Sequence, residues 1–391
     1  MINDFFFQVK TQLMAGVGAS RKLNELLVDK GFEHAVVLVD VGVSAHSEYF
    51  NEVHGILQKA CSSLKVIKLR GNEEPDYDYL DEVAAQVRAV EKLDVLIGIG
   101  GGSCLDITKA VAVLKTNLGK GIEYRGFDMA KKPGVPTIAI PTTAGTASEV
   151  TINAVFTDKK EMKKLGINGL HLDATFAILD AEWTMSCPHM VAVSSGTDAL
   201  THTLESFMCN NANALTRCFS REAFKLLFGA LPSLVDDPEN KDKRQEILLG
   251  SYMAGIALFN SGSGVSGAFS YPIGVNFKVP HGIGGAIFLA SVVEYNVDRG
   301  YTDYAELVDV VEPGFEGDPQ EKSRHFVDMI RSICVHLGVP TDLGQWGLTA
   351  TDIDTVHEML KPLQGAFDQN PIAFSAETDA RELLAKHLRR T

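Results

Sequence analysis

Short apolar runs alternate with helical patterns through the first half of the chain, and this alternation restricts the fold more than any other feature. Buried-type strands are expected at 35–40, 64–69, 94–99, 136–140 and 177–180. Helical patterns follow the first three of them, over about 47–60, 75–93 and 103–114. Strands joined through helices pair in parallel, so the sequence predicts an α/β domain built on a doubly wound parallel sheet.

Beyond about residue 190 the pattern becomes almost entirely helical. Helical periodicity is found over 190–209, 213–231, 241–260, 282–295, 302–311, 320–337, 351–363 and 376–388. The stretch 185–188 interrupts the pattern, and 391 residues are enough for two hydrophobic cores. We therefore expect an α/β domain at 1–188 and an all-helical domain at 189–391.

Composition excludes several classes of protein. The net charge is −14 and no basic run is longer than two residues, as at 159–160 and 163–164, so we expect no nucleic-acid partner. The longest apolar runs have the length of a strand, which predicts no membrane span. The N-terminus has no basic signal-peptide region, and the six cysteines form no C-x-x-C pair. These features predict a cytoplasmic protein with reduced thiols.

A run of glycines joins one expected strand to the next helix. The run 98–103 separates an apolar strand from a helix whose first turns carry Asp106 and Lys109. At such a junction the backbone N–H groups and the helix N-terminus can hold a pyrophosphate, which glycines allow to approach closely. A flexible strand-to-helix turn is the alternative, but the strand–turn–helix context favours nucleotide binding.

Two further polar features lie where expected strands end. The Thr-rich loop 141–151 offers hydroxyls to phosphates, ribose or nicotinamide, and it fits equally well a turn with Thr146 or Ser148 as a helix cap. Asp40 closes the first strong strand, where an acid can bind both ribose hydroxyls of adenosine and repel a 2′-phosphate. Considered alone, Asp40 is explained as well by an ordinary loop acid.

The helical half contains residues with the chemistry of metal ligands. Asp198 and His202 are four residues apart, so on a helix they share a face and can converge on a divalent metal. Alternatively, Thr197 or Asp198 caps a helix and His202 is an ordinary histidine. His281, between a proline and a glycine, opens another helical stretch; it can be a ligand, although a lone histidine is more often structural.

Together these motifs resemble the iron-containing (group III, metal-dependent) alcohol dehydrogenases. The resemblance rests on four segments in family order and at family-like spacing, namely 100–106, 141–149, 198–205 and 280–282. It covers the chain from the first strand to about residue 290, and the helical remainder also fits.

The resemblance implies a fold and a set of site residues. The implied fold is a dinucleotide-binding α/β domain followed by a helical domain, an architecture shared with dehydroquinate synthase, with the active site in the cleft between them. The implied metal ligands are Asp198, His202 and His281. The implied cofactor residues are Gly100, Gly101, Gly102, Ser103 and Asp106 for the pyrophosphate, Thr142, Thr143 and Thr146 in the second loop, Lys164 near the cofactor, and Asp40 at the ribose. The acid at Asp40 predicts a preference for NAD over NADP.

The sequence departs from the family at three positions. The usual fourth metal ligand, a histidine five residues before Pro272, is Gly267 here, and a proposed proton-relay histidine is Tyr271. Ala147 replaces a usual glycine. With one Asp and two His, either three protein ligands and waters suffice, as in catalytic zinc sites, or the substrate supplies two oxygens. A weakly binding, often empty site is the third possibility, and we favour the first two.

These features predict an NAD(P)-linked alcohol dehydrogenase or aldehyde reductase. Its Fe²⁺ or Zn²⁺ ion would act as a Lewis acid on a small alcohol or a polyhydroxy, sugar-acid-like substrate while hydride passes to or from nicotinamide C4. Tyr271 is a candidate participant in proton transfer. The alternatives are a non-redox lyase or cyclase on the dehydroquinate-synthase-like scaffold, and an NAD-binding protein with a degraded metal site. We expect a homodimer, because the family usually dimerises.

Overall fold

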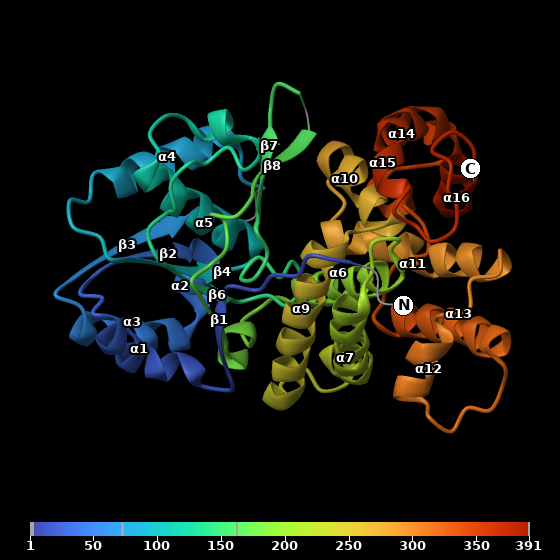
Figure 1. The fold of residues 1–391 in the computed structure, drawn as a ribbon, viewed down its shortest axis with the longest axis horizontal. Coiled ribbons are helices and arrows are strands. Elements are labelled where there is room, and N and C mark those ends of the chain that lie inside the picture. Colours follow the sequence, from blue (N-terminus) through green and yellow to red (C-terminus); the bar gives the residue numbers. More distant parts are fainter. Residues whose placement is uncertain (1–3, 72–73, 162, 390–391) are drawn as a thin grey trace. The chain divides into compact units, whose positions relative to one another are not determined.

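The computed structural model describes residues 4–71, 74–161 and 163–389, which belong to two compact units (Figure 1). One unit is Val9–Pro188, and the other combines His189–Thr391 with the N-terminal segment Met1–Gln8. The chain thus divides after Pro188, where the sequence analysis places the domain boundary. The difference is the N-terminal segment, which the sequence analysis assigns to the α/β domain.

The N-terminal segment is held by side chains of the helical unit. Gln8 N donates to Asn260 Oδ1 at 2.8 Å, and Asn260 Nδ2 donates to Gln8 O at 3.0 Å. The Phe7 ring stacks on Phe219 with ring centroids 5.8 Å apart. These partners lie more than 200 residues away in sequence, as the separation of 252 between Gln8 and Asn260 shows, so no local pattern could reveal the assignment.

A six-stranded sheet forms the centre of the α/β unit. Its order is β1 (Gln12–Ala15), β9 (Phe176–Leu179), β6 (Thr137–Pro141), β4 (Val95–Gly100), β2 (His34–Asp40) and β3 (Ser63–Leu69). Every neighbouring pair in this order is parallel. The predicted parallel sheet is therefore confirmed, with β1 as a strand that the sequence pattern did not indicate.

Helices cover both faces of this sheet (Figure 1). Successive residues of a strand point to opposite faces, and β2 shows this clearly. Val36 and Leu38 enter a core shared with α4 (Tyr77–Arg88) and α5 (Gly102–Thr116). Val37 and Val39 enter a second core shared with α1 (Leu23–Lys30) and α3 (Glu48–Ala60). A strand buried on both faces explains the unbroken apolar run seen in the sequence.

A small second sheet was not expected from the sequence. It contains β5 (Gly126–Phe127), β8 (Lys163–Asn168) and β7 (Asn153–Asp158) in that order, with β7 and β8 antiparallel. The burial of β7 alternates along the strand, so only one of its faces packs against the protein. Polar residues on the other face hid this strand among loop residues.

The second unit is helical, as predicted. Its helices are α6 (His189–Met208), α7 (Ala214–Ala230), α8 (Ser233–Asp236), α9 (Lys241–Ser261), α10 (Val265–Phe277), α11 (His281–Asp298), α12 (Ala305–Val311), α13 (Pro319–His336), α14 (Ile353–Leu360), α15 (Gln364–Phe367) and α16 (Asp379–His387). Among the described residues of this unit, β pairing is limited to one bridge between Thr349 and Arg389. No helix in the described ranges is long and apolar enough to cross a membrane.

Each unit contains one of the chain's two tryptophans. Trp183 is fully buried in the α/β unit, where its Nε1 donates to Ser20 Oγ at 2.7 Å and its ring meets Tyr49 edge-on. Trp346 lies in a 3-10 turn of the helical unit and is half-buried. The two indole rings therefore have different surroundings.

Candidate functional site

The glycine run and the Thr-rich loop lie against each other at the carboxyl end of the large sheet. Gly100 ends β4, and its carbonyl accepts a hydrogen bond from Thr142 N, just after β6, at 3.0 Å. A Cβ built on Gly102 would lie 2.6 Å from Thr146 Oγ1. Glycine is therefore required where the loops touch, and the two predicted cofactor loops are in direct contact.

The N-terminus of α5 points into this site. Its N-cap is Gly101, which makes no side-chain capping bond, and Ser103 in the first turn is exposed. The first N–H groups of a helix lack intrahelical partners and carry partial positive charge, so this end can receive a phosphate. Gly98 has a different role, because a Cβ there would lie 2.5 Å from Thr108 Oγ1, which means that it allows α5 to pack closely on β4.

Asp40 stands beside the glycine run. It ends β2 and caps α2 (Val41–His46), with Oδ1 accepting from Gly42 N at 2.7 Å. A Cβ built on Gly100 would lie 3.3 Å from the Asp40 Cβ, since β2 and β4 are paired neighbours. The acid is therefore next to the predicted pyrophosphate loop, as a ribose-binding acid would be.

Asp106 connects α5 to the other side of the site. The Ser148 hydroxyl donates to Asp106 Oδ1, and Val155 N donates to Oδ2 at 2.9 Å. The Lys109 ammonium lies 3.4 Å from Oδ1. Burial raises the pKa of the Asp106 carboxyl, and the Lys109 charge and these hydrogen bonds oppose that shift. The carboxylate is thus engaged by the protein and ties the Thr-rich loop and β7 to the helix.

The other predicted cofactor residues differ in their surroundings. Thr142 is buried, Thr143 is half-buried and Thr146 is exposed. Ala147 has φ +51°, a left-handed backbone conformation that glycine adopts without strain, which explains why glycine is usual at this position. Lys164 lies on β8 in the small sheet, and its ammonium is 2.6 Å from Glu74 Oε1.

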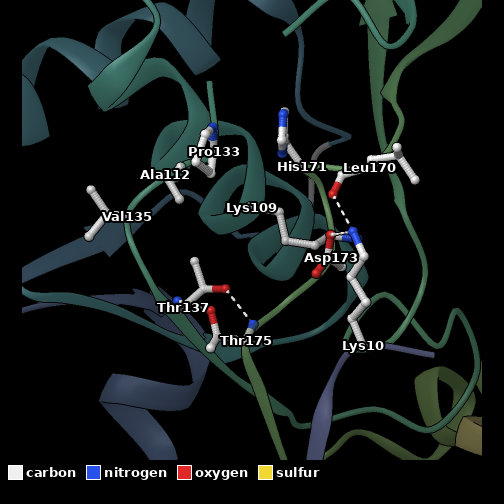
Figure 2. A pocket seen from close by; sticks show the side chains of 11 residues that line it. Lys10, Lys109, Ala112, Pro133, Val135, Thr137, Leu170, His171, Asp173 and Thr175 are labelled. Carbon is white, nitrogen blue, oxygen red and sulfur yellow. Dashed lines mark hydrogen bonds and ion pairs between the residues drawn. The ribbon is translucent and has the colours of Figure 1, made fainter. Parts of the chain in front are cut away.

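A pocket of about 200 Å³ in the α/β unit lies at the opposite edge of the sheet (Figure 2). Its lining includes Lys10, which precedes β1, Thr137, which begins β6, and Thr175, which precedes β9, so it lies at the amino ends of parallel strands. Lys10 Nζ donates to Leu170 O at 3.1 Å and lies 3.8 Å from Asp173. Figure 2 also marks the hydrogen bond between Thr137 and Thr175, and the pocket is not part of the two predicted cofactor loops.

In the helical unit, the three predicted metal ligands lie together. His202 Nε2 is 3.6 Å from Asp198 Oδ1, and His281 Nε2 is 3.9 Å from the same oxygen. Asp198 and His202 share one face of α6, and His281 is the first residue of α11. Because α6 begins at His189, Thr197 and Asp198 lie in the middle of a helix, and the alternative that either one caps a helix is wrong.

His281 is oriented by its neighbours on α10. Its Nδ1 is 2.8 Å from Ser270 Oγ, and the Ser270 hydroxyl donates to Gly267 O at 2.6 Å. The same Ser270 oxygen is 3.3 Å from His281 Nε2. Since the hydroxyl has one hydrogen, it accepts from the imidazole, and the shorter distance to Nδ1 favours the tautomer that carries the ring proton on Nδ1. The Tyr271 ring meets the His281 ring edge-on, with centroids 5.0 Å apart, and Tyr271 is 40% exposed.

Glu205 lies one turn further along the same face of α6. It is fully buried, and Gly267 N donates to its Oε1 at 2.8 Å. Its Oε2 is also buried and has no hydrogen-bond partner among the described residues. Burial raises the pKa of Glu205 to about 7, while the Gly267 N–H and the nearby His202 act in the opposite direction. Glu205 closes the sequence segment 198–205, and the sequence alone predicts no role for it.

The side chains of these residues are close together, but they are not arranged as a complete set of metal ligands. Within the described part of the chain, no group of three or more His, Cys, Asp or Glu side chains is placed so that it could hold a metal ion as it stands. The separations of 3.6 and 3.9 Å are nevertheless close to the ligand–ligand edge of a tetrahedral site, about 3.4 Å for bonds of about 2.1 Å. The sequence and the family resemblance predicted these three residues as candidate ligands; the contacts of Ser270 and Glu205 required the coordinates.

Two family models together match nearly the whole chain. The model described as iron-containing alcohol dehydrogenase matches residues 10–181, and the C-terminal model of the Fe-containing alcohol dehydrogenase family matches residues 192–386. The two matched regions correspond to the two structural units.

Named relatives and a solved structure agree with these models. Lactaldehyde reductase of Escherichia coli K12 is 35% identical over 263 residues, which are 66% of this chain and 68% of that protein. NAD-dependent methanol dehydrogenase of Bacillus methanolicus is 27% identical over 350 residues, 89% of this chain and 91% of that protein. The crystal structure of a 1,3-propanediol oxidoreductase has a TM-score of 0.90 at 25% identity and covers 98% of this chain and 99% of that one.

The relatives share one class of chemistry, the oxidation of alcohols and the reduction of aldehydes. The family suggested by the four sequence motifs is the family of both models, and the same motifs lie in the two sites described above. The protein is an oxidoreductase, and its chain belongs to the iron-containing alcohol dehydrogenase family.

Proposed function

We propose that the protein interconverts a small alcohol and its aldehyde with NAD as the hydride carrier and a divalent metal held by Asp198, His202 and His281. The observation that carries this proposal is that one carboxylate oxygen of Asp198 faces Nε2 of both histidines, at 3.6 and 3.9 Å. The three residues come from two helices, and His281 is far in sequence from Asp198 and His202. A merely structural role for either histidine does not require this convergence.

The chemistry of these donors fits the metal that the family implies. Imidazole nitrogen and carboxylate oxygen are ligands that Fe²⁺ and Zn²⁺ both accept. The buried Glu205 Oε2, which has no hydrogen-bond partner among the described residues, is a further negative group suited to a nearby cation. A cation bound there supplies Lewis acidity, which favours the deprotonated form of an alcohol.

A neighbouring side chain, Ser270, orients His281 for binding a metal. The shorter contact of Ser270 Oγ with Nδ1 favours the His281 tautomer whose Nε2 lone pair is free for a metal, and Nε2 lies 3.9 Å from Asp198 Oδ1. Hydrogen bonds from outside the ligand set commonly fix the tautomer of ligating histidines in this way. We therefore assign Ser270 as a positioning residue.

The α/β unit supplies the groups that suit a dinucleotide. The uncapped N-terminus of α5 fits a pyrophosphate, the exposed Ser103 and Thr146 offer hydroxyls to it, and the Asp40 carboxylate fits the adenosine ribose. Bound NAD accepts or delivers the hydride. Asp106 ties the Thr-rich loop to α5 through Ser148 and ties β7 to α5 through Val155, and we propose that it acts by positioning these elements. Lys164 is proposed to lie near the bound cofactor, and this proposal is based only on the family resemblance.

Tyr271 is proposed to take part in proton transfer. Its ring lies against His281, and a phenol can donate and accept a proton through the same oxygen. Its exposure gives that oxygen access to water, which a proton leaving the site requires. Replacement by phenylalanine keeps the ring contact and removes only the hydroxyl.

The substrate is proposed to be a small or polyhydroxy alcohol. The relatives described above act, by name, on lactaldehyde and methanol, and the similar structure is an oxidoreductase of 1,3-propanediol. Each of these is an oxidoreductase, which favours redox chemistry over the lyase or cyclase alternative. A homodimeric state and a cytoplasmic location are proposed on the family resemblance and on the six free cysteines.

The test is turnover with and without metal. A panel of alcohols, aldehydes and sugar acids would be screened with NAD or NADH, following NADH absorbance. We expect at least one substrate to be turned over, and His281→Ala to lower kcat/KM by about 1,000-fold or more, because a ligand and its Lewis acid are lost together. His54→Ala, on α3, is the control and should leave turnover unchanged. Full activity in a metal-stripped preparation would rule the proposal out.

A further inference from the structure

We propose that the helical unit contains a second ligand site, a cavity beside α13 that binds an organic cation with an apolar body, such as a primary amine carrying an aromatic or alkyl group. The cavity has a volume of about 450 Å³, within the range of about 300–1,000 Å³ that is usual for small-molecule sites. None of its described lining residues is among the metal or cofactor residues named above. The inference therefore goes beyond the proposed function and does not depend on it.

One side of this α13 cavity is apolar. Met329 and Ile333 lie about one turn apart on α13, and each is 5% exposed. Phe228, near the end of α7, and Pro232, just beyond that helix, complete the apolar lining. The Phe228 ring packs on the fully buried Phe224 ring, with centroids 5.3 Å apart. The apolar side is thus anchored in the core, and a hydrocarbon or aromatic group lying on it would be removed from water.

The other side of the cavity is acidic. The described lining contains the carboxylates of Glu312 and Asp328, and it contains neither lysine nor arginine. An arginine does lie next to it, because Arg331 Nη1 is 3.5 Å from Asp328 Oδ1. The same guanidinium is bound more closely by Glu294 on α11, at 2.6 Å from Nη2, so two acids share one positive charge. The local excess of negative charge favours a cationic ligand.

Both histidines of the lining are already paired with a carboxylate. His325 Nε2 is 2.8 Å from Glu312 Oε2, and His336 Nε2 is 3.0 Å from Asp236 Oδ2. An ionised carboxylate only accepts, so each imidazole donates its Nε2 proton and, when neutral, has no second N–H for a ligand. The acidic side therefore offers a ligand mainly acceptor atoms. An ammonium group matches this, because it has three N–H donors and no acceptor.

The acid and the histidine at one end of the cavity are held in place by their neighbours. The Phe315 ring stacks on the His325 ring, with centroids 4.2 Å apart and planes 7° from parallel. Glu312 directly follows α12, and its backbone N donates to Val308 O at 2.7 Å. A charged group that is positioned before binding loses less conformational freedom when a ligand arrives. Glu312 is therefore the acid that we expect to receive the ammonium group.

The first experiment tests the two requirements of the ligand, positive charge and an apolar body. Isothermal titration calorimetry of the full-length protein with 2-phenylethylamine at pH 8 should show saturable binding of one molecule per chain. Ethylamine lacks the apolar body and 3-phenylpropanoate has the opposite charge, so each should bind about 10-fold more weakly or worse. No saturable binding of 2-phenylethylamine, or equal affinity for 3-phenylpropanoate, would overturn the inference.

Variants then locate the bound amine. Glu312→Gln keeps an oxygen for His325 and removes the charge, so it should raise the Kd for 2-phenylethylamine by about 5-fold or more. Ser332→Phe places a ring in the cavity from an exposed lining position and should abolish binding while the far-ultraviolet circular dichroism stays as in wild type. Glu316→Gln, which neutralises an exposed acid outside the lining, is the matched control and should keep the wild-type Kd. Wild-type affinity in either Glu312→Gln or Ser332→Phe would contradict the assignment.

A last titration separates this cavity from the candidate metal site, since an amine can also bind a metal ion. His281→Ala should bind 2-phenylethylamine with the wild-type Kd, because His281 does not line the α13 cavity. That result would support the inference even if the protein turned over no alcohol. Loss of amine binding in His281→Ala would place the amine at the metal site, which would overturn the inference and leave the proposed function standing.

Discussion

The Asp40 side chain carries a negative charge and also caps a helix. Exchanging one carboxylate oxygen for an amide nitrogen removes the charge and keeps an oxygen for the cap. Its Oδ1 accepts from Gly42 N and Val43 N at the start of α2. Asparagine caps a helix as well as aspartate does, and it carries no charge. The substitution Asp40→Asn therefore tests the carboxylate charge while it keeps the local fold.

We expect Asp40→Asn to raise the ratio of kcat/KM for NADP over that for NAD by about 10-fold or more, since the 2′-phosphate no longer meets a negative charge. Steady-state kinetics with both cofactors would measure the ratio. Asp29→Asn, an exposed acid on α1, should leave it unchanged. An unaltered ratio in Asp40→Asn would show that this acid does not face the ribose.

Glu149 gives the α/β unit a pH-dependent stability. Its side chain is buried, and burial raises its pKa from 4.5 to about 7, against the effect of the Lys109 ammonium. The folded state thus holds the proton more tightly than the unfolded chain does. Its contribution to stability is fully present below pH 4.5 and is lost as the pH rises through about 7.

We expect the free energy of unfolding to fall between about pH 5 and pH 8 by up to about 3 kcal/mol on account of this group. Glu149→Gln should flatten that dependence. Urea titrations across this pH range would measure the slope, and Glu91→Gln, which replaces an exposed glutamate, serves as the control. A slope that is the same in wild type and Glu149→Gln would contradict the assignment.

At the scale of elements, the two cofactor loops depend on their mutual contact. The space between α5 and the Thr-rich loop is closed, because a Cβ on Gly102 would lie 2.6 Å from Thr146 Oγ1 and 2.7 Å from its Cγ2. A methyl group there must move the loop away from the N-terminus of α5. The glycine is therefore needed for the relation between two elements more than for either one.

We expect Gly102→Ala to raise the dissociation constant for NAD by about 10-fold or more, as small displacements of positioned groups weaken binding strongly. Adding Thr146→Ala should recover part of the affinity, since it removes the atoms that clash. Equilibrium binding of NAD would be measured for both variants. Equal affinity in wild type and Gly102→Ala would show that the loops do not hold the cofactor.

Elements with a strong local pattern were predictable, and those that depend on distant partners were not. The strands β2, β4 and β6 are continuous apolar runs and were found within a residue or so. The helix α10 was missed because Gly264, Gly267 and Pro272 are poor helix residues. Its first turn is stabilised by Glu205, which belongs to another helix. The helix propensities of glycine and proline describe local preferences, so they give no information on a stabilising residue from another helix.

In the candidate site, too, some features follow from local sequence and others depend on distant partners. The spacing of Asp198 and His202 on one helix is a local property, and it predicted their convergence. The roles of Ser270 and Glu205 arise where α6, α10 and α11 meet, so they depend on tertiary packing. A missing ligand at Gly267 was visible in the sequence; the hydrogen bond from Gly267 N to Glu205 was not.

For the whole molecule, the chain path places residues from both ends of the sequence in one unit. The α/β unit Val9–Pro188 is an insertion between the N-terminal segment and the remaining helical unit. Asn260 exchanges two hydrogen bonds with the backbone of Gln8, so a single side chain secures the start of the insertion.

We expect Asn260→Leu to lower the free energy of unfolding of the helical unit by about 1–3 kcal/mol, because two hydrogen bonds to buried or half-buried groups are lost. The Gln8 amide should exchange its hydrogen faster, as hydrogen–deuterium exchange with mass spectrometry would show. Asn211→Ala, at an exposed position between α6 and α7, is the control. Unchanged exchange at Gln8 in Asn260→Leu would contradict this account of the N-terminal segment.

The distribution of the two tryptophans makes the protein its own optical reporter. Indole fluorescence moves to longer wavelength as water reaches the ring, and the buried Trp183 and the half-buried Trp346 start from different surroundings. Trp346→Phe leaves emission only from the α/β unit, and Trp183→Phe leaves it only from the helical unit. The loss of each unit's structure can therefore be followed by light alone, without an added dye.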